Sequence, residues 1–357
     1  MAKPPPKIQL QSIFPEVAPR PDAPKLLVEH EARLKRIGSD GKELNDCGRV
    51  GPVERPLAYD PAGETAYRYV CASGGSSRKD FSELRAFSMR TGQSSVVWQM
   101  SVNQWVLWLL EWIESADGVG GQLFGLMAIV RPVRQQVAIE HRLFAIDPKD
   151  PAPKYRPLCR DAYKPLAFSR QGRKIAFSGA EGTYLVSLKG ERLASLDSDR
   201  LATAHGACFD PSGRARIALG GSGIHLWDFE KGVCTRLTRK GRHPLWSPDG
   251  RCIWYAGSSG ALMRYDFETG RDEQVLAIEP DRFPDFWKSR PVVFSRCGRF
   301  LAAMLSTKRL KGVTRRTGGI APKERIFIEN NCLCLIDLER SEFWRVEGRY
   351  FPAFRWL

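Results

Sequence analysis

The chain has 357 residues and a formal net charge of +15, with 43% hydrophobic and 27% charged residues. This composition excludes an intrinsically disordered chain and indicates a substantial buried core. The most apolar stretches, Trp105–Ile113 and Leu123–Val130, fall far short of the ~20 residues that a membrane-spanning helix needs. We therefore expect no membrane span.

Residues 1–24 contain seven prolines and are predicted to form an extended N-terminal arm. Three of these prolines, Pro4, Pro5 and Pro6, interrupt the apolar stretch that a secretory signal would need. The nine cysteines are odd in number and show no C-x-x-C spacing, which is typical of a protein in a reducing compartment. A cytoplasmic location is therefore expected.

Residues 25–357 are predicted to form one all-β domain, because a short hairpin pattern recurs along them. In each copy an apolar strand ends in an aromatic residue, a turn rich in Ser, Asp and Pro follows, and a glycine closes the turn before a second apolar strand. Ser and Asp bond backbone amides in such turns, and glycine supplies the positive φ that ends them. The copies span residues 57–63, 166–172, 207–213, 245–250 and 292–298.

A second pattern follows each hairpin: an apolar strand ends in Asp or Ser, and another turn leads to a fourth strand. It is clearest at residues 226–232, 264–270 and 335–339. Each unit is thus predicted to be a four-stranded antiparallel meander. The units recur about every 40 residues, which is the period of β-propeller blades.

The turn Trp246-Ser247-Pro248-Asp249-Gly250-Arg251 makes the resemblance more specific. These units resemble the WD-like repeats of bacterial TolB-type β-propellers, over roughly residues 56–357. The resemblance implies a fold and says little about substrate.

Six blades are recognised directly, and the segment 351–357 looks like the first strand of another. Residues 26–55, which include Leu26–Val28 and Leu34–Ile37, can supply its missing strands. Closing the ring with strands from both termini would remove an exposed sheet edge. Seven blades are favoured, with six as the alternative.

The sixth blade carries a basic insertion at about residues 307–328, between its second and third strands, and we expect it to be a loop. In propellers such loops open on the same face as the connections between blades, so this face is the candidate partner-binding surface. The predicted contact residues are all basic: Lys308, Arg309, Lys311, Arg315, Arg316, Lys323, Arg325, Arg239, Lys240 and Arg242.

Three functions are compatible with these features. The main prediction is a non-catalytic protein-interaction platform, a subunit or scaffold of a larger bacterial assembly that binds an acidic protein surface. The first alternative is a nucleic-acid-binding propeller, because a basic surface attracts phosphates. The second is a propeller hydrolase or lyase with an active site at the central mouth, for which His205 and His243 are the candidates.

No enzyme activity is predicted from motifs, because the chain lacks a phosphate-binding G-x-x-x-x-G-K-[ST] loop and a G-x-S-x-G nucleophile elbow. Its five histidines are dispersed, so no metal site and no cofactor are expected.

Overall fold

We describe the protein from a computed structural model. The structure describes residues 10–30, 33–49, 57–72, 81–100, 104–114, 121–133, 136–150, 156–160, 164–169, 173–179, 182–197, 206–257, 261–278, 292–295, 297–314, 324–346 and 354–356.

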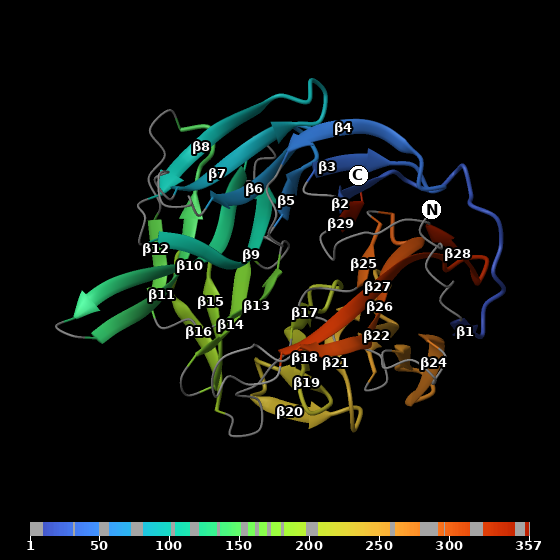
Figure 1. Ribbon diagram of the computed structural model, residues 1–357. Helices are drawn as coiled ribbons and strands as arrows, with labels where there is room; N and C mark the ends of the chain where they lie inside the picture. The colour runs from blue at the N-terminus through green and yellow to red at the C-terminus, as the bar shows by residue number, and fades with distance from the viewer. Residues whose placement is uncertain are drawn as a thin grey trace.

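The chain forms a β-propeller of seven four-stranded antiparallel blades arranged in a ring (Figure 1). The prediction of an all-β propeller, with seven blades favoured, is therefore confirmed. We letter the strands of each blade A to D, from the centre of the ring outward. From blade 1 through blade 7, each A strand contacts the A strand of the next blade around this centre.

Blades 1 to 6 follow one another along the chain. Blade 1 comprises β5 (Leu57–Asp60), β6 (Thr65–Ala72), β7 (Phe81–Ser88) and β8 (Ser94–Met100). Blade 2 comprises β9 (Gln104–Glu114), β10 (Gly121–Val133), β11 (Gln136–Ile146) and β12 (Arg156–Arg160). Blade 3 comprises β13 (Lys164–Ser169), β14 (Lys174–Gly179), β15 (Gly182–Ser187) and β16 (Arg192–Asp197).

Blade 4 comprises β17 (Ala207–Phe209), β18 (Arg216–Gly220), β19 (Ile224–Asp228) and β20 (Val233–Arg236). Blade 5 comprises β21 (Arg242–Trp246), β22 (Cys252–Ala256), β23 (Leu262–Asp266) and β24 (Arg271–Ile278). Blade 6 comprises β25 (Val292–Phe294), β26 (Phe300–Thr314), β27 (Glu324–Asp337) and β28 (Glu342–Val346).

Blade 7 closes the ring, because its strands come from both ends of the chain. Its A strand is β29 (Phe354–Trp356), and its other strands are β2 (Leu26–His30), β3 (Arg33–Ile37) and β4 (Glu43–Arg49). Leu26 of β2 packs in the core shared with blade 6, whereas the next residue, Leu27, packs in the core shared with blade 1. This alternation lets one strand join two neighbouring blades.

The turns between strands A and B follow the predicted chemistry. In blade 5 the hydroxyl of Ser247 accepts a hydrogen bond from the backbone N–H of Cys252 at 2.9 Å, and Gly250 closes the turn with φ of 73°. In blade 6 the hydroxyl of Ser295 accepts from the N–H of Phe300 at 3.0 Å, and Gly298 has φ of 78°. Glycine is favoured at both closing positions because residues with a side chain rarely adopt a positive φ.

Residues 10–24, which we call the N-terminal segment, run along the outer edges of blades 5 and 6. Its strand β1 (Leu10–Ser12) pairs antiparallel with β24, and Glu16 forms a parallel bridge with Phe343 of β28. This pairing occupies part of the edge backbone that could otherwise pair with another chain.

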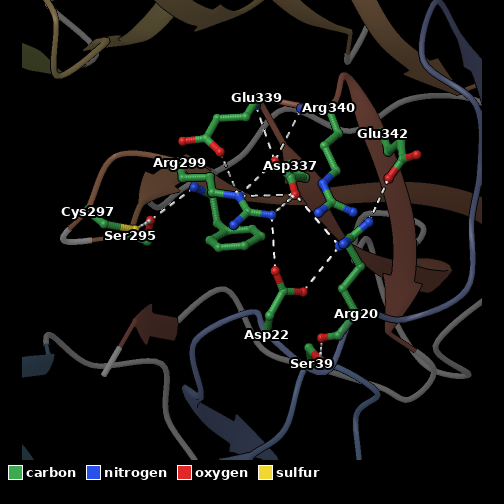
Figure 2. A network of polar contacts seen from close by, with 11 residues as sticks. Arg20, Asp22, Ser39, Ser295, Cys297, Arg299, Asp337, Glu339, Arg340 and Glu342 are labelled. Atoms are coloured by element: carbon green, nitrogen blue, oxygen red, sulfur yellow. Dashed lines mark hydrogen bonds and ion pairs between the residues drawn. The ribbon is translucent and has the colours of Figure 1, made fainter.

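A network of ion pairs fixes the end of this segment to blade 6 (Figure 2). Arg20 donates to Glu342 at 3.0 Å, and Arg299 donates to Asp22 at 3.1 Å. Arg299 also binds the carboxylate of Asp337. The network thus joins the N-terminal segment to the start of β26 and to the end of β27.

The basic insertion of blade 6 differs from the loop that was expected. Strands β26 and β27 continue beyond the blade as a paired hairpin, in which Lys308 lies opposite Glu329 and Thr314 lies opposite Glu324. The expectation of a loop was therefore wrong for residues 307–314 and 324–328, which belong to β26 and β27. Backbone pairing between the two arms extends the sheet through this charged segment.

Candidate functional site

A cavity of about 250 Å³ lies at the inner strands of blades 3 to 6. It extends along the whole of β17, from Gly206 at one end to Pro211 at the other. The A strands β13, β21 and β25 of the flanking blades supply the remaining walls. The cavity therefore belongs to the centre of the ring, where several blades contribute side chains to one space.

His243 lines this cavity at the start of β21. Its φ of 51° is left-handed, which is uncommon for a residue with a side chain. The pairing of β21 with β22 is irregular between Arg242 and Leu245. Such local irregularity in a strand redirects side chains and is frequent beside active sites.

Two glycines leave the room that His243 occupies. A Cβ on Gly206 would lie 3.1 Å from Nδ1 of His243, and a Cβ on Gly220 would lie 2.8 Å from its backbone nitrogen. The N–H of Gly220 donates to the carbonyl of Gly206 at 3.0 Å. Two backbone segments of blade 4 thus pass close to the histidine because neither carries a side chain.

Asp210, at the opposite end of the cavity, has a structural task. Its carboxylate accepts hydrogen bonds from Nε of Arg216 at 2.9 Å and from the N–H of Ser212 at 2.9 Å. Burial would raise the pKa of Asp210, but these hydrogen bonds and the charge of Arg216 together hold it below its usual value. A carboxylate engaged in this way is a poor proton acceptor.

The third ionisable residue in the wall is Cys208 of β17. Its sulfur accepts a hydrogen bond from the backbone N–H of Trp246 at 3.5 Å and lies 3.6 Å from the carbonyl of Phe209. Among the described ionisable residues that line the cavity, His243 carries the side chain type that ordinarily exchanges protons near neutral pH.

The predicted basic residues fall into two groups. Arg239 and Lys240 are exposed on the connection from β20 to β21, and Arg242 is exposed as the first residue of β21. A bridge between Gly221 and Gly241 ties this connection to the turn between strands B and C of blade 4.

We call the side of the ring that carries these turns and connections the connector face. His243 and Gly206 lie at this end of their strands.

The second group belongs to the insertion of blade 6. The backbone places Lys308, Arg309 and Lys311 on β26 and Arg325 on β27. Arg315, Arg316 and Lys323 lie outside the described residues, as does the other candidate histidine, His205.

Sequence reasoning named His243 but missed Gly206 and Gly220, which shape its surroundings. Gly220 begins the run Gly220-Gly221-Ser222-Gly223 and is the last residue of β18. No sequence signal connects these glycines to a histidine in the next blade.

Within the described ranges, no group of three or more His, Cys, Asp and Glu side chains is placed to hold a metal ion. The same part of the chain contains no helix long and apolar enough to cross a membrane.

Comparison with known proteins supports the fold. No protein-family model matches the chain, and no curated protein matches it. Among solved structures, an oligogalacturonate lyase in complex with manganese is similar with a TM-score of 0.52 and 14% identity, covering 76% of this chain and 79% of the lyase. The dihydro-heme d1 dehydrogenase NirN is similar with a TM-score of 0.52 and 14% identity, covering 98% of this chain and 81% of NirN. The predicted fold-level resemblance to propeller proteins is confirmed.

These comparisons correct the main functional prediction. A non-catalytic interaction platform was expected because catalytic motifs are absent, but two propellers similar to this chain are enzymes, and the prediction was wrong. The physical reason is that a cavity at the centre of a propeller draws single residues from several blades, so its chemistry leaves no contiguous motif. At 14% identity the likeness shows the fold alone and does not establish catalysis in this chain.

Proposed function

We propose that this protein is a propeller hydrolase or lyase whose active site is the central cavity at the connector face. The observation that carries the proposal is His243, held in a left-handed conformation in the cavity wall and given room by Gly206. Unusual backbone conformations cluster at functional sites because surrounding structure must hold them in place.

In this proposal the imidazole of His243 accepts a proton from a substrate carbon or from an attacking water. Histidine suits this role because its ordinary pKa lies near neutrality. Asp210, already engaged with Arg216, keeps the turn of blade 4 in place. The walls of the cavity also include the apolar residues Phe168 and Val293.

Charge favours an anionic substrate. The chain carries a formal charge of +15, and Arg239, Lys240 and Arg242 are exposed on the connector face, in the segment just before His243. A cluster of one sign near a concave site raises the local concentration of oppositely charged ligands.

We place the protein in a reducing compartment such as the cytoplasm. The described cysteines Cys159, Cys208, Cys234, Cys252, Cys297 and Cys334 are free thiols, which supports this placement.

The proposal is tested by screening the full-length protein against anionic esters, phosphoesters and uronic-acid oligosaccharides. Turnover of at least one class is expected, and His243→Gln should reduce it by about a hundredfold or more. The matched control is His141→Gln, because His141 lies on β11 of blade 2 and does not line the cavity. Equal turnover by the intact protein and His243→Gln would remove His243 from the site.

Nucleic-acid binding is a second candidate, favoured by the net charge and by the basic residues Lys308, Arg309, Lys311 and Arg325 of the blade 6 hairpin. Retention of RNA or DNA should then weaken steeply with added salt, because each neutralised phosphate releases counterions. Binding that is insensitive to salt, or no retention at low salt, would reject this candidate.

A further inference from the structure

A second, smaller cavity of about 200 Å³ lies on the connector face beside the central one. The turns between strands B and C of blades 4 and 5 and the connection from β20 to β21 supply its described walls. Arg242 lines this cavity, and the next residue, His243, lines the central cavity. Arg242 and His243 are consecutive in sequence, so one short segment of backbone contributes to the walls of both cavities.

The walls of the smaller cavity are largely backbone. A Cβ on Gly241 would lie 2.8 Å from Ile224 and from the ring of Tyr255, and a Cβ on Gly257 would lie 2.9 Å from Met263. Any side chain at either position would therefore collide with these neighbouring residues. Glycine at these two positions therefore lets the backbone of the cavity wall pack closely against Ile224, Tyr255 and Met263.

The described lining residues include two cations, Lys240 and Arg242, and no carboxylate. They flank Gly241, so both project from one short segment of chain. Arginine offers a planar set of donors and lysine a compact charge, and together they suit an oxyanion. Neither cation needs to leave water completely, because both are exposed.

Neighbouring residues fix the backbone that carries these cations. Arg236 donates from its guanidinium to the carbonyls of Ser222, Thr238 and Arg239. The hydroxyl of Thr238 accepts from the N–H of Ile224 at 3.0 Å and donates to the carbonyl of Lys240 at 2.9 Å. The connection is thus cross-linked to the adjoining turn before any ligand arrives, which lowers the entropy cost of binding.

We infer that this cavity binds an oxyanion, the carboxylate or phosphate group of the substrate, through Lys240 and Arg242. The inference rests on the proposed function, because it makes the smaller cavity a subsite of the same reaction centre. An anionic group held there places the adjoining part of the substrate at His243. The substrate is therefore an anionic compound whose reacting bond is next to its charged group.

The inference is tested by calorimetric titration of the full-length protein with inorganic phosphate and, separately, with acetate at constant ionic strength. The intact protein should bind at least one of them, and the double variant Lys240→Gln/Arg242→Gln should bind it about tenfold or more weakly. Preference for phosphate would indicate a phosphoester substrate, and equal or better binding of acetate would indicate a carboxylate.

The matched control is Lys231→Gln/Arg214→Gln, which removes the same two charge types from exposed positions on the opposite face of blade 4. It should bind within about twofold of the intact protein, since charges beyond a Debye length are screened. Thermal unfolding of all three proteins checks that each is folded.

Absence of binding by the intact protein, or equal weakening in both double variants, would overturn the inference. Anion binding without any turnover in the screen would reject the proposed reaction and leave the anion site standing. Turnover that depends on His243, without anion binding, would reject the anion site and leave the proposed reaction standing. The two failures are therefore distinguishable.

Discussion

Arg299 donates hydrogen bonds from Nε and Nη2 to the carboxylate of Asp337, at 3.1 and 2.6 Å. The Asp337 side chain is fully buried, with 0% exposure. The pair joins the beginning of β26 to the end of β27, and Arg20 approaches the same carboxylate to 3.7 Å (Figure 2). Blade 6 and the N-terminal segment therefore share one buried negative charge.

Replacing Asp337 should destabilise the ring. Asp337→Asn removes the buried charge that Arg299 shares with Arg20. Arg299, whose side chain is 22% exposed, keeps Asp22 and Glu339 as partners. Loss of such charged hydrogen bonds costs about 1–3 kcal/mol. Chemical denaturation should report this loss. The control Glu339→Gln alters another carboxylate near Arg299, but Glu339 is 68% exposed, and its replacement should cost less than about 1 kcal/mol.

Acid should weaken the same contacts. Burial would raise the pKa of Asp337, but the hydrogen bonds and charge of Arg299 outweigh it and hold that pKa below its usual value. The pKa of Asp210 is lowered in a similar way by Ser212 and Arg216.

Both carboxylates thus contribute stability that is fully present above their unfolded pKa of about 3.9. This stability is lost as the pH falls through their lower folded values. Denaturation midpoints measured on either side of about pH 4 should show the loss. The double variant Asp210→Asn/Asp337→Asn should show a smaller pH dependence; an unchanged dependence would contradict the assignment.

Ring closure depends on the packing of β2. Leu27 has 0% exposure and packs against blade 1, so Leu27→Ala should lower the free energy of unfolding by about 2–5 kcal/mol. Leu193→Ala is the matched control, because Leu193 is 47% exposed on β16. Similar losses in both variants would argue that blade 7 is not packed as described.

Comparing alanine substitutions at Gly206 and Gly213 distinguishes the effect of backbone strain from the effect of crowding His243. Gly206 and Gly213 have φ of 98° and 81°, so alanine strains the backbone at both by about 1–2 kcal/mol. A Cβ at 206 would also crowd His243, whereas a Cβ at 213 meets nothing within 4 Å. Gly206→Ala should therefore shift the imidazole resonances of His243 in NMR spectra and reduce turnover, and Gly213→Ala should do neither. Identical spectra in the two variants would contradict this geometry.

The fold could be predicted because its decisive signals are local. The turn from Ser247 to Gly250 contains its own hydrogen-bonding serine and its own positive-φ glycine, and the same chemistry recurs in blade 6 at Ser295 and Gly298. The strands that close the ring were predicted from apolar segments such as Leu26–Val28. In a propeller these segments fit only as the missing strands of the last blade.

Long-range relationships could not be predicted in this way. Arg20 and Glu342 are 322 residues apart in sequence, and only the closed ring brings them together. The hairpin of β26 and β27 was expected to be a loop because its charged sequence masks its strand pairing. The surroundings of His243 depend on glycines in another blade, which no local pattern connects to it.

The central claim is that His243 accepts a proton in the central cavity, and the pH profile of kcat/KM tests it most directly. The profile should be measured for the compound that the screen identifies, using the intact protein and His243→Gln. We predict that kcat/KM of the intact protein rises as histidine deprotonates, between about pH 5 and 8, and that the variant loses both the rise and about a hundredfold in rate. A variant that keeps the rate and profile of the intact protein, or an intact protein that turns over no compound, would contradict the claim.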